Sequence, residues 1–399
     1  MERLIETFRN RLKFITLDFS RSIMDKIDWN SRLIGIRGAR GVGKTTLILQ
    51  YIKTHFPDDN SVLYVSLDDL WFTQNNLPDL INDFVKLGGK RLFLDEVHKY
   101  PSWSPVIKNI YDSYPDLKIV FTGSSLLEML NSRSDLSRRV NPYYMKGLSF
   151  REYLNFELKT KFDIYSLDDI TGNHLELSRV ITNQIPPLLH FRKYLRSGYY
   201  PFFKEAGDLY SDRLKDIINV IIDFELPSLR NVNVSQCTKL KKILMIIYES
   251  APFIPNIREL SSTTDIDRNT MINYLNYLAE ADLLRNLFHD VSGMTRMKKP
   301  DKIFPENTNL QYAFHYKMPE MKSINETFLA NQLSYNHTLT VTENGGLKNE
   351  DDRIFFAGPI SSDKKENLLI MSETNYIASD NIEFGIGNSI PIWLFGFMY

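Results

Sequence analysis

The sequence has little of what marks secreted, membrane-spanning or nucleic-acid-coating proteins. Its single cysteine, Cys237, cannot form a disulfide within the chain, as is usual in a reducing cytosol. Its longest apolar runs, 243–248 and 390–399, fall far short of the roughly 20 residues that a membrane-spanning helix needs. The first 14 residues carry charges throughout and lack the apolar core of a signal peptide. These absences predict a cytoplasmic protein with no membrane partner.

The composition is that of an ordinary globular protein. The 48 Lys and Arg residues balance 49 Asp and Glu residues, so a broad basic surface for nucleic acid is not expected. Hydrophobic residues make up 43% of the 399 residues and charged residues 24%, which are typical globular values. At roughly 100–200 residues per domain, this length predicts two to four domains.

Strand-like and helix-like segments alternate over the first 150 residues. Four short apolar runs are expected to form strands, at 32–37, 62–67, 91–94 and 117–122. Segments with helical spacing lie between them, at 44–55, 77–87 and 106–114. This alternation predicts an α/β fold with a parallel sheet that helices cover on both faces.

The pattern changes at Ser149. Ser149 and Glu152 have the spacing of a capping box, which begins a helix. Mainly helical spacing follows to about residue 230. Three more helices are expected at 239–250, 256–261 and 268–281, with the outline of a helix-turn-helix. Strand-like pieces then appear, such as 353–356 and 368–371. The chain is therefore expected to divide into four parts: 1–148, 149–235, 236–295 and 296–399.

A phosphate-binding motif connects the first predicted strand to the first predicted helix. It has the form G-x-x-x-x-G-K-[ST], and this strand and helix are the context that a P-loop requires. Glycines let backbone N–H groups converge on phosphate oxygens, next to the positive end of the helix. Lys44 is expected to reach the β- and γ-phosphates of ATP, and Thr45 to bind Mg²⁺. The predicted phosphate-binding residues are Gly38, Ala39, Arg40, Gly41, Val42, Gly43, Lys44, Thr45 and Thr46.

Two acidic residues end the third predicted strand. Asp95 follows the apolar run 91–94 and should lie at the carboxyl edge of the sheet, beside the P-loop, as a ligand of Mg²⁺. Glu96 is then placed to polarise the attacking water. Taken alone, an Asp-Glu pair after a strand can equally be a solvated turn. Together with the P-loop, it predicts hydrolysis as well as binding.

Four more polar residues are candidates for the catalytic site. Thr122 and Ser124 end the fourth strand, where a small polar group can sense the γ-phosphate or position water. Ser124 could instead cap a helix. Arg138 and Arg139 are candidates for an arginine finger, in cis or from a neighbouring subunit of a homo-oligomer. The alternative for both arginines is a solvated basic surface.

Four segments in this order give the chain a family resemblance: LIGIRGARGVGKTT, LFLDEVHKYPSW, IVFTGSSLLEM and LSFREYLNF. They resemble the prokaryotic AAA+ ATPases of the archaeal-ATPase, STAND-like type, which end in a winged helix and an uncharacterised region like restriction endonucleases. The resemblance extends to SGYYPFF, PDKIFPENTNLQYAF, NETFLANQL and IPIWLFGFMY.

The resemblance implies a P-loop AAA+ sheet core with a helical lid, a winged helix and a carboxy-terminal α+β domain. It makes Gly38, Gly43, Lys44 and Thr45 the Walker A residues, Asp95 and Glu96 the Walker B pair, and Thr122 or Ser124 sensor 1. Gly198 and Pro201 would correspond to a Gly/Pro element near the nucleotide, although Gly-Tyr-Tyr-Pro can also be a simple turn.

The carboxy-terminal part imitates a nuclease motif only formally. Asp351 or Asp352, followed by Asp363 and Lys365, has the order of a D…D-x-K motif, whose carboxylates would hold Mg²⁺. The segment around Asp363 is polar throughout and is expected to form a loop, not the required strand. We therefore expect a structural or partner-binding domain. Its apolar end, 390–399, should dock into the core or onto a partner.

Two functions remain in view. The first is an ATP-hydrolysing molecular switch that acts on an unidentified protein client. The alternative is an ATP-bound regulator that binds DNA, at most weakly, through the winged helix. Its candidate contacts are Arg268, Asn269, Asn273, Lys298 and Lys299. The net charge of −1 and the apolar character of helix 268–281 favour the switch.

Overall fold

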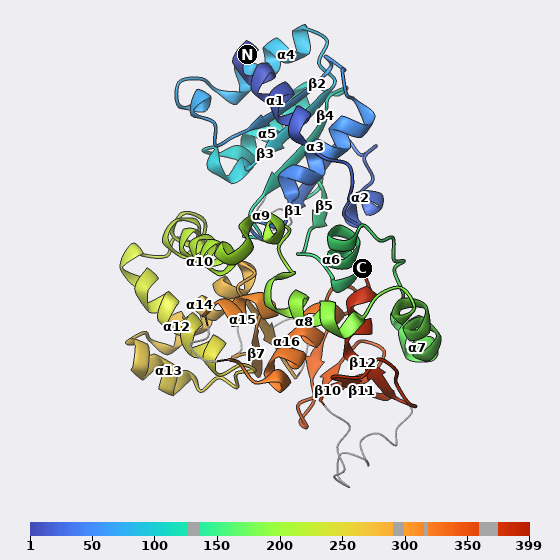
Figure 1. Cartoon of the computed structure of the whole chain (residues 1–399). Helices are drawn as coiled ribbons and strands as arrows, with labels where there is room; N and C mark the ends of the chain where they lie inside the picture. Colours follow the sequence, from blue (N-terminus) through green and yellow to red (C-terminus); the bar gives the residue numbers. More distant parts are fainter. Residues whose placement is uncertain (127–135, 290–298, 315–317, 359–373) are drawn as a thin grey trace. The chain divides into compact units, whose positions relative to one another are not determined.

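The computed structural model describes residues 1–126, 136–289, 299–314, 318–358 and 374–399. The chain divides into two compact units, Met1–Gly147 and Leu148–Tyr399 (Figure 1). Outside the described part lie Lys298, Asp363, Lys365 and the expected strand 368–371.

Unit 1 contains a five-stranded parallel sheet with the order β2-β3-β4-β1-β5. Its strands are β1 (Leu33–Arg37), β2 (Val62–Ser66), β3 (Arg91–Asp95), β4 (Lys118–Gly123) and β5 (Asn141–Tyr144). All neighbouring pairs run parallel. The four predicted strands and the α/β class are confirmed. The sequence patterns did not identify the fifth strand, which pairs with β1 at one edge of the sheet.

Helices pack on both faces of this sheet (Figure 1). The α-helices of unit 1 are α1 (Glu2–Phe14), α2 (Ile23–Lys26), α3 (Lys44–His55), α4 (Leu77–Lys86) and α5 (Trp103–Ser113). On one face Phe93 of β3 contacts Tyr51 of α3, with ring centroids 6.2 Å apart. On the other face Leu63 of β2 packs in one apolar cluster with Phe84 of α4. Helix α1, which the sequence patterns did not identify, packs along the edge strand β2.

Unit 2 begins with helices, as expected. They are α6 (Phe150–Leu158), α7 (Leu167–Thr182), α8 (Pro187–Ser197), α9 (Phe203–Ala206), α10 (Tyr210–Val220) and α11 (Leu226–Arg230). The capping box at the start of α6 is present, with Ser149 accepting from the Glu152 N–H and Glu152 accepting from the Ser149 N–H. Among the described residues, no helix combines the length and the apolar character needed to cross a membrane.

Three helices and an antiparallel strand pair follow. The helices are α12 (Cys237–Glu249), α13 (Ile257–Thr264) and α14 (Arg268–Glu280), which confirms the three that were predicted. Strands β6 (Leu284–Leu287) and β7 (Lys302–Pro305) pair antiparallel. Asp267 caps α14 by accepting from two N–H groups at its start.

The rest of unit 2 is a mixed α and β region. Helices α15 (Thr308–Phe314) and α16 (Met321–Leu333) precede a sheet of order β12-β11-β10-β9-β8. The strands are β8 (Thr340–Val341), β9 (Leu347–Lys348), β10 (Ile354–Ala357), β11 (Asn375–Ser379) and β12 (Ser389–Pro391). The last segment, the short helix Ile392–Phe397, is fully buried within unit 2. Docking of the apolar end into the core is therefore confirmed.

Candidate functional site

The P-loop connects β1 to α3 and contains three glycines with distinct roles. Gly41 and Gly43 have φ angles of 85° and 98°, which side-chain-bearing residues rarely adopt. Gly38 lies against β5, where a Cβ atom would come within 2.1 Å of the Met145 backbone oxygen. The loop therefore needs glycine for its conformation at two positions and for close packing at the third. The strand that leads into it, β1, is held on both sides by parallel pairing with β4 and β5.

Lys44 is the first residue of α3, and its ammonium group lies across the loop. The Nζ atom donates to the backbone oxygens of Gly38, at 2.8 Å, and Ala39, at 2.9 Å. Only 5% of the residue is exposed. The charge is thus held inside the turn whose N–H groups are expected to receive phosphate. Of the other loop residues, Arg40 and Thr46 are exposed.

Asp95, at the end of β3, accepts hydrogen bonds from three hydroxyl groups. Thr45 and Tyr64 donate to Oδ2 at 2.6 Å and 2.8 Å. Thr122, at the end of β4, donates to Oδ1. Only 2% of Asp95 is exposed. The structure therefore brings the predicted residues Thr45, Asp95 and Thr122 together and adds Tyr64 of β2, which the sequence did not indicate.

Glu96 follows Asp95 and has a left-handed backbone conformation, with φ of 54°. Its N–H donates to the Thr122 hydroxyl at 3.2 Å, and its Oε2 lies 3.4 Å from Nε2 of the buried His98 side chain. The Nδ1 atom of His98 accepts from the Ser124 N–H at 3.4 Å. The ring thus connects the predicted water-orienting carboxylate to the end of β4. His98 is therefore a hydrogen-bonding residue of the site.

Arg21 is a buried residue that sequence reasoning missed. Its guanidinium donates to three backbone oxygens, those of Val42 at 2.8 Å, Lys146 at 2.7 Å and Gly147 at 2.9 Å. Val42 belongs to the P-loop, whereas Lys146 and Gly147 follow β5. Arg21 therefore supports the P-loop. It belongs to no recognisable motif, so the sequence pattern gives no signal for this role.

The structure does not bring Arg138 and Arg139 to the P-loop of their own unit. Both precede β5, which runs parallel to β1, so they lie at the amino edge of the sheet, whereas the P-loop lies at the carboxyl edge. One strand of this length spans about 13 Å. Arg139 also makes a two-fold ion pair with Asp112 of α5, at 3.0 and 3.1 Å. Arg138 is exposed.

Gly198 and Pro201 belong to unit 2. Gly198 ends α8, and a Cβ atom there would come within 2.5 Å of Tyr194 and 2.9 Å of Tyr153. The next residue, Tyr199, donates its N–H to the buried Asn309 side chain at 2.8 Å. Packing inside unit 2 thus accounts for the glycine, which favours the reading of this segment as a turn.

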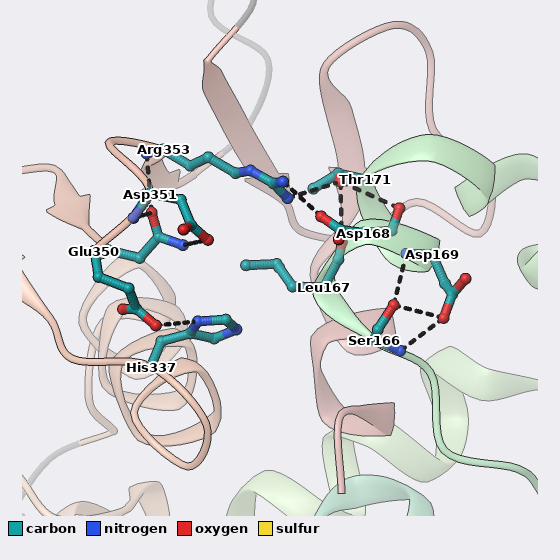
Figure 2. Close-up of polar contacts among 10 residues, drawn as sticks. Ser166, Leu167, Asp168, Asp169, Thr171, His337, Glu350, Asp351 and Arg353 are labelled. Atoms are coloured by element: carbon teal, nitrogen blue, oxygen red, sulfur yellow. Dashed lines mark hydrogen bonds and ion pairs between the residues drawn. The ribbon is translucent and has the colours of Figure 1, made fainter.

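The acidic residues between β9 and β10 are held in a turn of unit 2 (Figure 2). The Asn349 side chain contacts Asp351 at 3.4 Å, and Asp352 pairs with Lys348 at 2.5 Å. Arg353, which follows this turn, pairs with Asp168 of α7 at 2.5 Å and also contacts Thr171 of the same helix (Figure 2). In the described part of the chain, no group of three or more His, Cys, Asp or Glu residues could hold a metal ion.

Glu350 in the same turn pairs with His337. The Glu350 carboxylate accepts from the Thr338 N–H and lies 2.9 Å from Nδ1 of His337. Burial would raise the pKa of Glu350, but these hydrogen bonds and a backbone hydrogen bond hold the pKa below its ordinary value. The turn is therefore an internally paired structural connection.

Comparison with known proteins identifies the domain that contains the P-loop. Residues 30–154 match the family described as AAA domain. Two curated relatives are uncharacterized proteins of Methanocaldococcus jannaschii. MJ1637 is 27% identical over 331 residues, which are 79% of this chain and 69% of that protein. MJ1544 is 25% identical over 262 residues, which are 62% of this chain and 55% of that protein.

Solved structures give a weaker similarity. AMPPCP-bound DnaA from Aquifex aeolicus is 14% identical, with 67% of this chain and 93% of that chain covered and a TM-score of 0.29. A DNA replication initiation factor is also 14% identical, with coverages of 65% and 85% and a TM-score of 0.28. The assignment rests on the matched family and on the P-loop and parallel sheet described above. Residues 30–154 of this chain thus match an AAA domain, and unit 1 has the α/β fold of a P-loop NTPase.

Proposed function

We propose that unit 1 binds ATP with Mg²⁺ and hydrolyses it, and that the chain is a molecular switch for an unidentified protein client. The observation that carries this proposal is the contact of Thr45 with Asp95, beside Lys44 in the P-loop. These are the residue types that hold the metal and the phosphates in P-loop NTPases. A cytoplasmic location and assembly into a homo-oligomer remain predictions from the sequence.

The residues present fit Mg²⁺ and ATP. Magnesium prefers hard oxygen ligands, and the Thr45 hydroxyl and Asp95 carboxylate supply them 2.6 Å apart. The loop has the two left-handed glycines that allow consecutive N–H groups to face an anion. Its lysine is already inside the loop. When bound, Mg²⁺ would neutralise charge on the β- and γ-phosphates.

Each residue then has a specific role in turnover. Lys44 would exchange its two carbonyl partners for phosphate oxygens and offset their negative charge. Asp95 would hold the Thr45 hydroxyl toward the metal. Glu96 would orient the attacking water and accept its proton, a contribution typically worth about 10²–10⁴-fold in rate. Thr122 supports both carboxylate positions, because it donates to Asp95 and accepts from the Glu96 N–H.

The test is direct. The purified chain should release phosphate from ATP in Mg²⁺, and the release should stop when the metal is chelated. Turnover measured against protein concentration adds a test of assembly, since an arginine supplied by a neighbouring subunit makes the rate per chain rise with concentration. A chain that neither binds ATP in a Mg²⁺-dependent way nor releases phosphate would contradict the proposal.

The remaining parts of the chain are proposed to transmit the nucleotide state. We retain 149–235 as the lid, 236–295 as the winged helix and 296–399 as the carboxy-terminal domain. Three helices followed by strand β6 support the winged-helix assignment, and β6 pairs antiparallel with β7, which lies just beyond residue 295. In this view the nucleotide state changes how these parts are presented to the client.

A DNA-binding regulator is the second candidate. Arg268, Asn269 and Asn273 of α14 are exposed, which favours this role. However, Asp265 and Asp267 lie beside them, and Asp265 already pairs with Lys239 at 3.1 Å. A surface of mixed charge gives few phosphate contacts. Salt-sensitive DNA binding without ATP turnover would favour the regulator over the switch.

A further inference from the structure

Of the three described residues that donate to Asp95, Tyr64 is the one outside the sequence motifs. It lies in β2, at the edge of the sheet, paired in register with Phe93 of β3. Its side chain reaches past this position to Asp95, two residues further along β3. Only 2% of Tyr64 is exposed. The pairing of β2 with β3 therefore places the Tyr64 hydroxyl against the Asp95 carboxylate, and β2 contains no predicted phosphate-binding residue.

Arg11 of α1 fixes the direction of this hydrogen bond. The Nη1 atom of Arg11 lies 3.0 Å from the Tyr64 hydroxyl, and a guanidinium can only donate. The Tyr64 oxygen therefore accepts from Arg11, and its single hydrogen points to Asp95 Oδ2.

Helix α1 is itself held along β2 on both sides of this contact. Arg3 pairs with Asp69 beyond the end of β2, at 2.7 Å. Arg9 donates to Asn60 before its start, also at 2.7 Å. Phe8 contacts the Tyr64 ring, with centroids 5.9 Å apart. The helix is therefore docked over the tyrosine, and Arg11 is the member of this set that acts on the hydroxyl.

We propose that Tyr64, oriented by Arg11 of α1, is a positioning residue for the metal-binding carboxylate of Asp95. The inference rests on the proposed function, because Asp95 is the Mg²⁺ ligand only in that function. Tyr64 and Thr45 donate to the same oxygen, Oδ2, so together they fix how the carboxylate is turned. Among the described residues, Thr122 donates to the other oxygen, Oδ1. Loss of the Tyr64 donor leaves a buried carboxylate under-bonded and free to rotate.

The experiment compares Tyr64→Phe with Tyr51→Phe. Both substitutions remove one hydroxyl and keep a buried ring, and Tyr51 stacks on Trp29 with centroids 3.7 Å apart. Binding of a fluorescent ADP analogue is measured against Mg²⁺ concentration and again with EDTA. Tyr64→Phe should raise the half-saturating Mg²⁺ concentration about tenfold, because a hydrogen bond to a charged group is lost. Binding of the analogue in EDTA should match that of Tyr51→Phe, because only the metal-dependent part of binding relies on Asp95.

A second variant tests the part played by α1. Arg11→Met keeps the length of the side chain and removes the donor to Tyr64, so it should raise the Mg²⁺ requirement in the same direction but by less. If Tyr64→Phe and Tyr51→Phe need the same Mg²⁺ concentration while the unsubstituted chain binds the analogue in a Mg²⁺-dependent way, this inference is wrong and the proposed function stands. If the unsubstituted chain shows no Mg²⁺-dependent binding, both are wrong.

Discussion

Ser149 and Tyr399 are 250 residues apart in the chain, yet the Ser149 hydroxyl donates a 2.6 Å hydrogen bond to the Tyr399 backbone oxygen. Arg151 donates to the same oxygen at 2.9 Å. The Tyr399 ring is buried and stacks on Tyr335, with centroids 3.7 Å apart. The first helix of unit 2 and the last residues of the sequence therefore form one core.

The first prediction concerns this core and uses two isoleucines close together in the sequence. Ile392 is fully buried, whereas Ile386 is 80% exposed. Ile392→Ala should lower the free energy of unfolding of unit 2 by about 2–5 kcal/mol, because it leaves a cavity. Ile386→Ala should change it by less than about 0.5 kcal/mol. Urea unfolding followed by intrinsic fluorescence measures both, and equal midpoints would show that the segment is not docked.

The second prediction concerns Lys44. With ATP at 100 times its dissociation constant, ligand binding should stabilise the unsubstituted chain by about 2.7 kcal/mol. Lys44→Ala should lose most of this stabilisation, since the charge inside the loop is gone. Lys86→Ala removes the same charge from an exposed position at the end of α4 and serves as the control. A thermal melt in which Mg-ATP stabilises Lys44→Ala as much as the control would refute the role of Lys44.

The third prediction separates hydrolysis from binding. Glu96→Gln keeps the size of the side chain but loses the charge that orients water. It should bind ATP normally and hydrolyse it at least tenfold more slowly, which corresponds to about 1.4 kcal/mol in the barrier. Glu6→Gln, at an exposed position on α1, is the control for the loss of one carboxylate. Turnover by Glu96→Gln at the control rate would assign the water-orienting role to another residue.

The fourth prediction concerns Arg21. Arg21→Lys keeps the charge but replaces a planar fork by a single ammonium, which cannot reach three oxygens with the same geometry. ATP binding should weaken about tenfold, as expected for the loss of hydrogen bonds from a charged group. The control is Arg3→Lys, at a surface ion pair with Asp69. If the two variants bind ATP equally well, Arg21 does not support the loop.

The fifth prediction concerns the carboxy-terminal part. With Mg²⁺ or Mn²⁺ present, the purified protein should not cut DNA or RNA. The described acidic residues of the β9–β10 turn are paired with neighbouring side chains. The assay also covers Asp363 and Lys365, which lie outside the described residues. Cleavage that disappears in Asp363→Asn or Lys365→Ala would overturn the prediction.

The parts of the fold and site that could be predicted are those with a local signal. The P-loop spacing, the apolar run before Asp95 and the capping box at Ser149 are each contained in a few consecutive residues. The described structure brings Lys44, Thr45, Asp95 and Thr122 together because parallel strands end at one edge. The alternation of strands and helices along the chain already predicts a parallel sheet, and therefore that residues at the ends of its strands lie at one edge.

The parts that were missed depend on contacts between distant segments. Strand β5 is short and partly exposed and contains Pro142, which is tolerated because the strand lies at the sheet edge. Tyr64 reads as one more apolar residue of a buried strand, and only the pairing of β2 with β3 brings its hydroxyl to Asp95. Helix α1 was within reach of sequence reasoning, since Leu4, Phe8 and Leu12 recur every four residues.

The close approach of Gly38 to Met145 has a mechanical consequence. With the Met145 oxygen filling the place of a side chain, the start of the P-loop has no free space on the β5 side. Any sideways displacement of the loop in that direction must push the end of β5, where the Met145 N–H is bonded to the Arg37 oxygen. Met145 lies two residues before the boundary of unit 1. A displacement of the phosphate-binding loop toward β5 would therefore also displace the segment through which the chain leaves unit 1.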